Sequence, residues 1–209
     1  MDPAWAAENL QTIRTLMERS ALYRRALAPV MLSLGSLGCI AAGAGYSLQI
    51  QSSVSFIVYW LAVGCCGVGS AYLRVRQQAM GEHEPFWSPP TRRVTQALVL
   101  PLAAGFAATL VLLLHPQRHD PRWTWWIPPL WMLFYGCALY AAGFFMPRGM
   151  KVFGCGFVAL GCFDLLFLTL RGTPRGGLGA HGVMGFAFGG LHLAYALYLY
   201  FTEKGRNQP

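Results

Sequence analysis

Charged residues are scarce in this chain, and acidic residues are the scarcest of them. Only 11% of the 209 residues are charged, and aspartate and glutamate together number 8. A soluble domain carries about 25% charged residues. Hydrophobic residues make up 55% of the chain, and its mean hydropathy is +0.42. This composition excludes an ordinary soluble domain and indicates a membrane protein.

The chain also lacks a cysteine framework. None of its cysteines forms a C-x-x-C pair, and all of them fall inside apolar runs: Cys39, Cys65, Cys66, Cys137, Cys155 and Cys162. Cysteines in such runs behave as small apolar residues. We therefore expect neither a disulfide scaffold nor a thiolate metal site.

Motifs of membrane-embedded hydrolases and transferases are missing as well. The sequence contains no HExxH, no GxSxG and no Gly-Lys phosphate loop, and the glycine-rich run at 176–179 follows no strand. We therefore expect a protein that is not an enzyme and that has no catalytic residues and no metal.

Long apolar runs, in contrast, are abundant. A helix needs about 20 mainly apolar residues to cross the hydrocarbon of a bilayer. Windows of this kind can be placed at 26–48, 54–73, 94–114, 124–145, 150–170 and 181–201. The runs are continuous rather than alternating, which favours helices over a barrel. The sequence predicts an all-α integral membrane protein, with a six-transmembrane-helix bundle over residues 26–202.

The basic residues, which give the chain a net charge of +8, follow this membrane pattern. If the N-terminus is cytoplasmic, the outer segments contain only Arg118, Arg122, Arg171 and Arg175 of the 16 lysines and arginines. The positive-inside rule then places both termini in the cytoplasm, including the tail 203–209. We expect a bacterial cytoplasmic (inner) membrane, and this distribution of charge removes the motive for a nucleic-acid partner.

Residues 1–25 are predicted to form a cytoplasmic, interfacial amphipathic helix. Ala6, Leu10, Ile13, Met17 and Ala21 recur at helical spacing and make one apolar face. Such a helix can lie on the lipid bilayer or pack against the bundle. Together with the predicted loop at 77–93, it makes a docking surface for a cytoplasmic protein partner. A homo-oligomer is a further expected partner, because six spans of this size could need one to form a conduit.

A polar intramembrane site is predicted from the last two windows. Asp164 is the only carboxylate inside an apolar run, and an ionised carboxylate facing lipid would cost a few kcal/mol, about 2.5 or more. His181 and His192 are 11 residues apart in the sixth window, which puts them within about 20° of one line on an α-helix. Tyr195 continues this line. If the line faces the fifth helix, these four residues form one site.

Two interpretations of this site stay open. A set of titratable groups could handle protons, an ion or a small solute, whereas a carboxylate that only binds a donor would fix the packing. The alternative function is a membrane sensor or an accessory or assembly subunit that acts through its cytoplasmic face. No repeat relates the first three windows to the last three, which weakens the transport interpretation.

A b-type haem is a weaker alternative, and no other cofactor is expected. His115 and His181 both fall near the outer ends of their windows, so they are the candidate axial ligands. Small residues are expected where helices touch, because they let two backbones approach closely. These residues are Gly35 and Gly43 in the first window, and the G-x-x-x-G pair Gly185 and Gly189 in the sixth.

Overall fold

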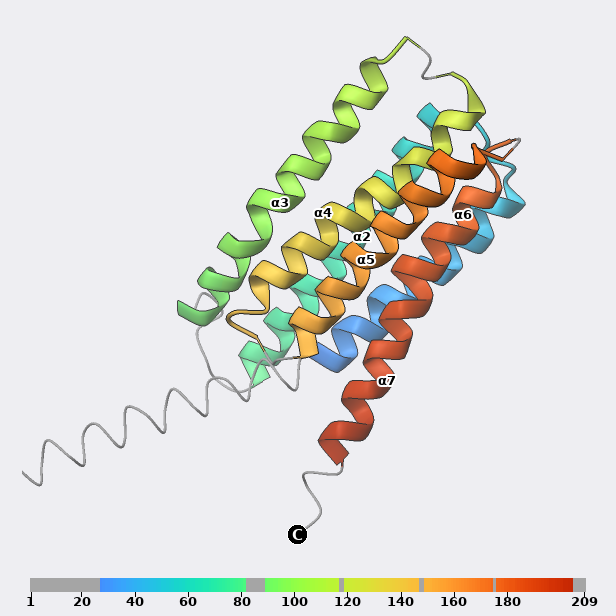
Figure 1. The fold of residues 1–209 in the computed structure, drawn as a ribbon. Coiled ribbons are helices and arrows are strands. Elements are labelled where there is room, and N and C mark those ends of the chain that lie inside the picture. The colour runs from blue at the N-terminus through green and yellow to red at the C-terminus, as the bar shows by residue number, and fades with distance from the viewer. Residues whose placement is uncertain (1–26, 82–88, 117–118, 147–148, 175, 205–209) are drawn as a thin grey trace, which may run out of the picture.

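The protein is described by a computed structural model that covers residues 27–81, 89–116, 119–146, 149–174 and 176–204 (Figure 1). Within these ranges the chain is helical and contains no strand. The elements are a helix over Leu27–Ser47, α2 (Ser53–Gly81), α3 (Pro89–Leu114), the 3-10 helix η1 (Pro121–Trp126), α4 (Ile127–Ala142), α5 (Gly149–Arg171), α6 (Gly179–Met184), the π-helix η2 (Gly185–Gly190) and α7 (Leu191–Lys204).

Within the described residues, five stretches of helix are long and apolar enough to cross a membrane. They are Leu27–Ser47, Ser53–Gly81, Thr91–Leu114, Gly149–Arg171 and Gly179–Thr202, the last made of α6, η2 and α7 in succession. Their outward faces carry large apolar side chains, such as Leu100, which is 76% exposed. Lipid, rather than water, suits such a surface. The chain is therefore an integral membrane protein.

Two predicted segments differ from the structure or lie outside it. The predicted helix over 1–25 lies outside the described residues. The predicted loop over 77–93 is helical at both of its described ends instead, because α2 continues to Gly81 and α3 already begins at Pro89. Residues 82–88 between these helices also lie outside the described part.

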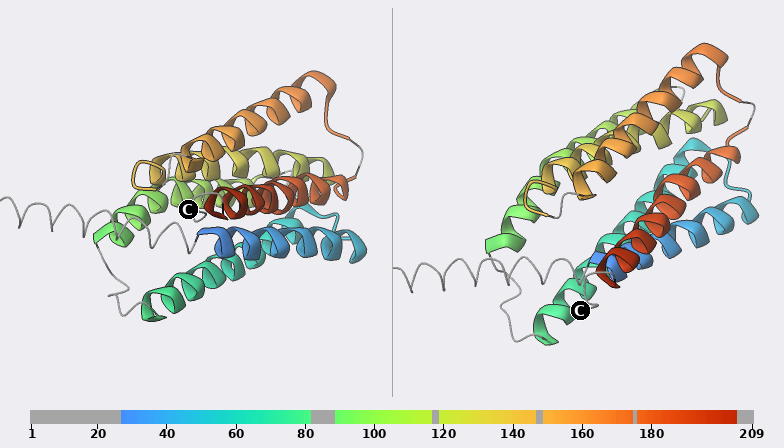
Figure 2. Two further views of the ribbon diagram at one scale, coloured as in Figure 1. Left: turned by 90° about the horizontal axis from the view of Figure 1, so that it is seen from below. Right: turned by 60° about the horizontal axis from the view of Figure 1, so that its bottom comes forward.

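The helices form two layers (Figure 2). One layer contains α3, α4 and α5, and the other contains the Leu27–Ser47 helix, α2 and the continuous α6–η2–α7 stretch. We call the end of the bundle with η1 the η1 end, which is uppermost in Figure 1, and the opposite end, where α5 begins, the Lys151 end.

Glycines let the helices of each layer meet backbone to backbone. Between α4 and α5, a Cβ atom on Gly136 would lie 2.8 Å from the Gly154 carbonyl oxygen. In the other layer, a Cβ atom on Gly189 would lie 2.8 Å from the Cys39 nitrogen, and one on Gly185 would lie 2.5 Å from Ala42 Cβ. Gly35 similarly meets Leu193. Three of the glycines expected at helix contacts therefore lie at such a contact.

Gly43, the fourth of these glycines, does not lie at a helix contact. A Cβ atom there would meet nothing within 4 Å in the described chain, whereas Gly38 and Gly45 touch η2 and α6. Gly43 is five residues beyond Gly38, so it is turned about 140° away from the contact face. The spacing of four that links Gly35 to Gly43 therefore does not follow this face.

The buried apolar side chains form one cluster toward each end of the bundle. The cluster toward the η1 end includes Phe56, Trp60 and Met184, and the cluster toward the Lys151 end includes Met150 and Phe157. Phe188 of η2 packs against both clusters. Each cluster surrounds one of the two histidines of the last span, as described below.

Polar bonds tie the loops together at the η1 end. Ser53 Oγ donates to the Asp120 carbonyl oxygen at 3.0 Å and lies 2.9 Å from Thr124 Oγ1. The Trp125 indole N–H donates to the Gly176 carbonyl oxygen at 2.6 Å. These bonds therefore link η1 to the start of α2 and to the segment that precedes α6.

Acidification is expected to loosen the start of η1. The Asp120 carboxylate accepts the Arg122 backbone N–H at 2.9 Å, and its hydrogen bond to the Arg122 guanidinium lowers the pKa of Asp120. Because this pKa is lower in the folded protein, the carboxylate contributes stability at neutral pH that is lost as the pH falls through its folded-state pKa. Hydrogen exchange should show a several-fold lower protection factor for the Arg122 amide at acidic pH. Asp120→Ala should show the same loss at neutral pH, and unchanged protection in both experiments would contradict this role.

Candidate functional site

His181 is fully buried, and both of its ring nitrogens are engaged. The Trp60 indole N–H donates to Nδ1 at 3.1 Å, and Nε2 lies 3.0 Å from the Ile50 carbonyl oxygen. An indole N–H can only donate and a carbonyl oxygen can only accept. The imidazole is therefore neutral, with its proton on Nε2, which donates to Ile50.

The surroundings of His181 show that it holds helices together. The centroid of its ring lies 4.7 Å from that of Phe56 on α2, and a Cβ atom on Gly45 would collide with the imidazole. The ring thus fills the space between α6, α2 and the Leu27–Ser47 helix. His181 has a structural role, because neither ring nitrogen is left for a ligand.

His192 has a different environment. It is only 2% exposed, and its Nε2 lies 2.7 Å from Tyr135 Oη on α4. Its ring also contacts Phe153 and Phe157 of α5, with centroids at 5.3 and 5.6 Å. Nδ1 has no hydrogen-bond partner of normal geometry among the described residues, although the Ala187 carbonyl interacts with the imidazole.

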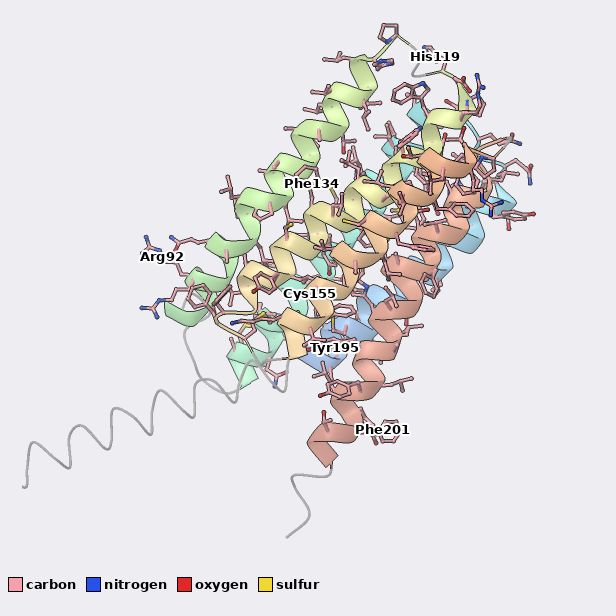
Figure 3. All side chains as sticks on the ribbon, in the orientation of Figure 1. Arg92, His119, Phe134, Cys155, Tyr195 and Phe201 are labelled. Atoms are coloured by element: carbon pink, nitrogen blue, oxygen red, sulfur yellow. The ribbon has the colours of Figure 1, made fainter. Side chains whose placement is uncertain are left out.

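Tyr195 lies one turn beyond His192 on the same face of α7. Its ring stacks on that of Phe153, with centroids 4.4 Å apart and planes inclined by 7°. The side chain is 8% exposed, and its hydroxyl oxygen has no hydrogen-bond partner in the described part of the chain. Figure 3 places this residue toward the Lys151 end of α7.

Asp164 extends the same face of α5 toward the η1 end. It is seven residues beyond Phe157, so it lies within about 20° of the same line and about 10 Å farther along the helix. The side chain is half-buried, and its Oδ2 atom is buried without a hydrogen-bond partner among the described residues. We define the α5–α7 seam as Asp164 of α5, His192 and Tyr195 of α7, and Tyr135 of α4, which contacts His192.

The structure therefore brings together only part of the predicted polar site. His192 and Tyr195 share the ring of Phe153, and Asp164 lies farther along the same face of α5. His181 faces α2 instead. The π-helix η2 separates the two histidines and winds more slowly than an α-helix, so the shared line expected from α-helical spacing is not kept.

Tyr135 is a residue of the seam that sequence analysis did not identify. Its hydroxyl meets His192 from another helix, 57 residues away in sequence. A buried tyrosine hydroxyl usually has a hydrogen-bond partner, but the sequence does not show which polar group it meets. The only signal was a tyrosine within the apolar run of the fourth window.

The haem candidates do not fit an axial pair. Iron needs a free imidazole nitrogen from each ligand, and both nitrogens of His181 are engaged. His115 lies at the η1 end, where its ring contacts that of Trp123 at a tilt, with centroids 4.4 Å apart. Among the described residues, no three of the His, Cys, Asp and Glu side chains gather as metal ligands.

Comparisons of the chain with family models, curated proteins and solved structures find no match.

Proposed function

We propose that this polytopic membrane protein handles protons, an ion or a small polar solute at the α5–α7 seam. One observation carries the proposal. The buried side-chain atoms without a hydrogen-bond partner in the described chain are Asp164 Oδ2, His192 Nδ1 and Tyr195 Oη, and His192 and Tyr195 both contact Phe153 on α5, the helix that carries Asp164. Each such atom costs about 1–3 kcal/mol. A species that enters the seam and pairs with them would offset that cost.

The packing interpretation of Asp164 has less support. It requires a protein donor that holds the carboxylate, and Oδ2 has none among the described residues. An intramembrane acid with a buried oxygen and no fixed partner is typical of ion and proton pathways. Asp164 would then serve as the part of the seam nearest the η1 end.

We also propose that the protein spans the membrane six times. The 16 residues of α4 follow η1 directly, and the two together run antiparallel to α5 from one end of the bundle to the other (Figure 1). Arg92 lies at the Lys151 end, opposite His119 at the η1 end (Figure 3). By the positive-inside rule, the cluster of Arg74, Arg76, Arg92 and Arg93 makes the Lys151 end cytoplasmic, with both termini, in a bacterial inner membrane. A sensor or accessory role would act through 1–25 and 77–93, and of these residues 1–25 and 82–88 lie outside the described part of the chain.

Asp164→Asn tests the proposed site. We expect the purified protein in liposomes to move at least one of three probes: protons, followed with an internal pH dye, ²²Na⁺, or glycerol, followed by light scattering. The variant should move that probe about tenfold more slowly, since a lost interaction of about 1.4 kcal/mol changes a rate by that factor. Its thermal unfolding should be unchanged, because the amide keeps the shape of the side chain.

Thr169→Val is the matched control, since Thr169 is an exposed polar residue of the same helix that bonds only locally, to the Leu165 carbonyl oxygen. This control should leave the flux unchanged. A folded Asp164→Asn protein with full flux, or a wild-type protein that moves none of the three probes, would overturn the proposal.

A further inference from the structure

The hydrogen bond between Tyr135 and His192 indicates which of the three proposed species the seam handles. We infer that the species handled there is a proton, and that the hydrogen-bonded pair of Tyr135 and His192 is the group that receives and releases it. Tyr135 then both fixes the tautomer of His192 and relays the proton to it. This inference rests on the proposed function and selects one of its three species.

The hydrogen bond to Tyr135 fixes the tautomer of His192. Tyr135 Oη and His192 Nε2 are 2.7 Å apart, which is a strong hydrogen-bond distance. A phenol O–H donates well and an imidazole nitrogen accepts well, so Tyr135 donates to Nε2. The proton of the neutral ring is then on Nδ1, which has no hydrogen-bond partner among the described residues. His192 therefore holds the opposite tautomer to His181.

The three unpartnered atoms belong to groups that share one kind of chemistry, the exchange of protons. They belong to a carboxyl, an imidazole and a phenol, and all three groups accept and release protons. A metal ion needs several ligands at once, and the described residues contain no group of three His, Cys, Asp or Glu side chains placed to bind one.

The surface around His192 is apolar. The rings of Phe153, Phe157 and Phe188 lie with centroids 5.3, 5.6 and 6.4 Å from that of the imidazole. Apolar rings cannot replace the hydration shell of sodium or the hydrogen bonds of a polar solute. A proton passed along hydrogen bonds requires neither.

The transfer moves one proton across the imidazole. A hydronium ion gives a proton to Tyr135 Oη and becomes water, while Tyr135 passes its own hydroxyl proton to Nε2. Nδ1 releases its proton to a second water, which becomes hydronium. The ring stays neutral with its proton now on Nε2, and one positive charge has moved. The cycle closes when the neutral ring reorients so that its unprotonated nitrogen again accepts the Tyr135 hydroxyl, and no proton passes back through Tyr135.

Tyr135→Phe tests this inference, because it removes the hydroxyl and keeps the ring. In wild-type protein labelled with ¹⁵N-histidine and held in liposomes, NMR should show His192 protonated on Nδ1 and His181 protonated on Nε2. The variant should lose the fixed tautomer of His192 and move protons about tenfold more slowly, as expected for the loss of one hydrogen bond of about 1–1.5 kcal/mol. Tyr140→Phe, on the same helix with an exposed side chain, is the matched control and should change neither measurement.

The outcomes separate this inference from the proposed function. Flux of ²²Na⁺ or glycerol that depends on Asp164, without proton flux, would overturn the inference and leave the proposed function standing. An Nε2-protonated His192 in the wild-type protein would also overturn it, and this measurement remains decisive if Tyr135→Phe does not fold. Absence of flux for all three probes would overturn both.

Discussion

His181→Ala should destabilise the protein by about 3–5 kcal/mol. The imidazole is fully buried, so its removal leaves a cavity between α6, α2 and the Leu27–Ser47 helix. It also leaves the Trp60 indole N–H and the Ile50 carbonyl without the partners that they have at 3.1 and 3.0 Å. An unpaired buried donor or acceptor costs about 1–3 kcal/mol in addition to the cavity.

Unfolding in mixed micelles, followed by circular dichroism as a denaturing detergent is added, would measure this effect. His119→Ala is the matched control, because His119 is an exposed histidine at the same end of the bundle (Figure 3). It should change the unfolding free energy by less than about 0.5 kcal/mol. Trp60→Phe should change the unfolding free energy by an amount between those of His181→Ala and His119→Ala, since it removes one donor and keeps most of the ring volume. Equal stability of His181→Ala and His119→Ala would show that the two hydrogen bonds contribute nothing.

The membrane class of the fold could be predicted because it depends on length and composition alone. A run of about 20 apolar residues has few structural alternatives, and the part of the chain that the structure describes contains five such helices. The ends of the helices were harder to predict. Charged residues such as Arg74 and Arg76 end an apolar run without ending a helix, so α2 continues through them to Gly81. Pro89 can begin α3 because a first-turn residue needs no intrahelical N–H bond.

The members of the candidate site could be predicted only in part. Asp164 is conspicuous because a carboxylate in an apolar run is rare. The roles of the two histidines depend on partners distant in sequence: Trp60 is 121 residues from His181, and Tyr135 is 57 residues from His192. The π-helix between the histidines has no distinct residue pattern beyond its glycines. It decides which helices each imidazole meets, so the sequence could not separate the structural histidine from the one at the seam.

Gly38→Leu is expected to cause the second large loss of stability, because it forces the Leu27–Ser47 helix away from η2. A Cβ atom on Gly38 would lie 2.5 Å from the Phe188 carbonyl oxygen and 2.8 Å from the Gly189 nitrogen. Overpacking against side chains costs about 1–3 kcal/mol. Here the obstacle is backbone, which cannot rotate away, so we expect a loss at the upper end of this range, about 3 kcal/mol or more.

The matched control is Gly43→Leu on the same helix, where a Cβ atom meets nothing within 4 Å. In the same unfolding assay, it should keep or slightly raise the stability, since leucine favours a helix more than glycine does by up to about 1 kcal/mol. Equal losses for the two variants would contradict the close contact at Gly38. The contact also bears on the seam, because Phe188 stacks on His192 at 6.4 Å. Displacement of η2 by a leucine at position 38 should therefore also disturb the bond between His192 and Tyr135, and the ¹⁵N signals of His192 should change while those of the Gly43→Leu protein do not.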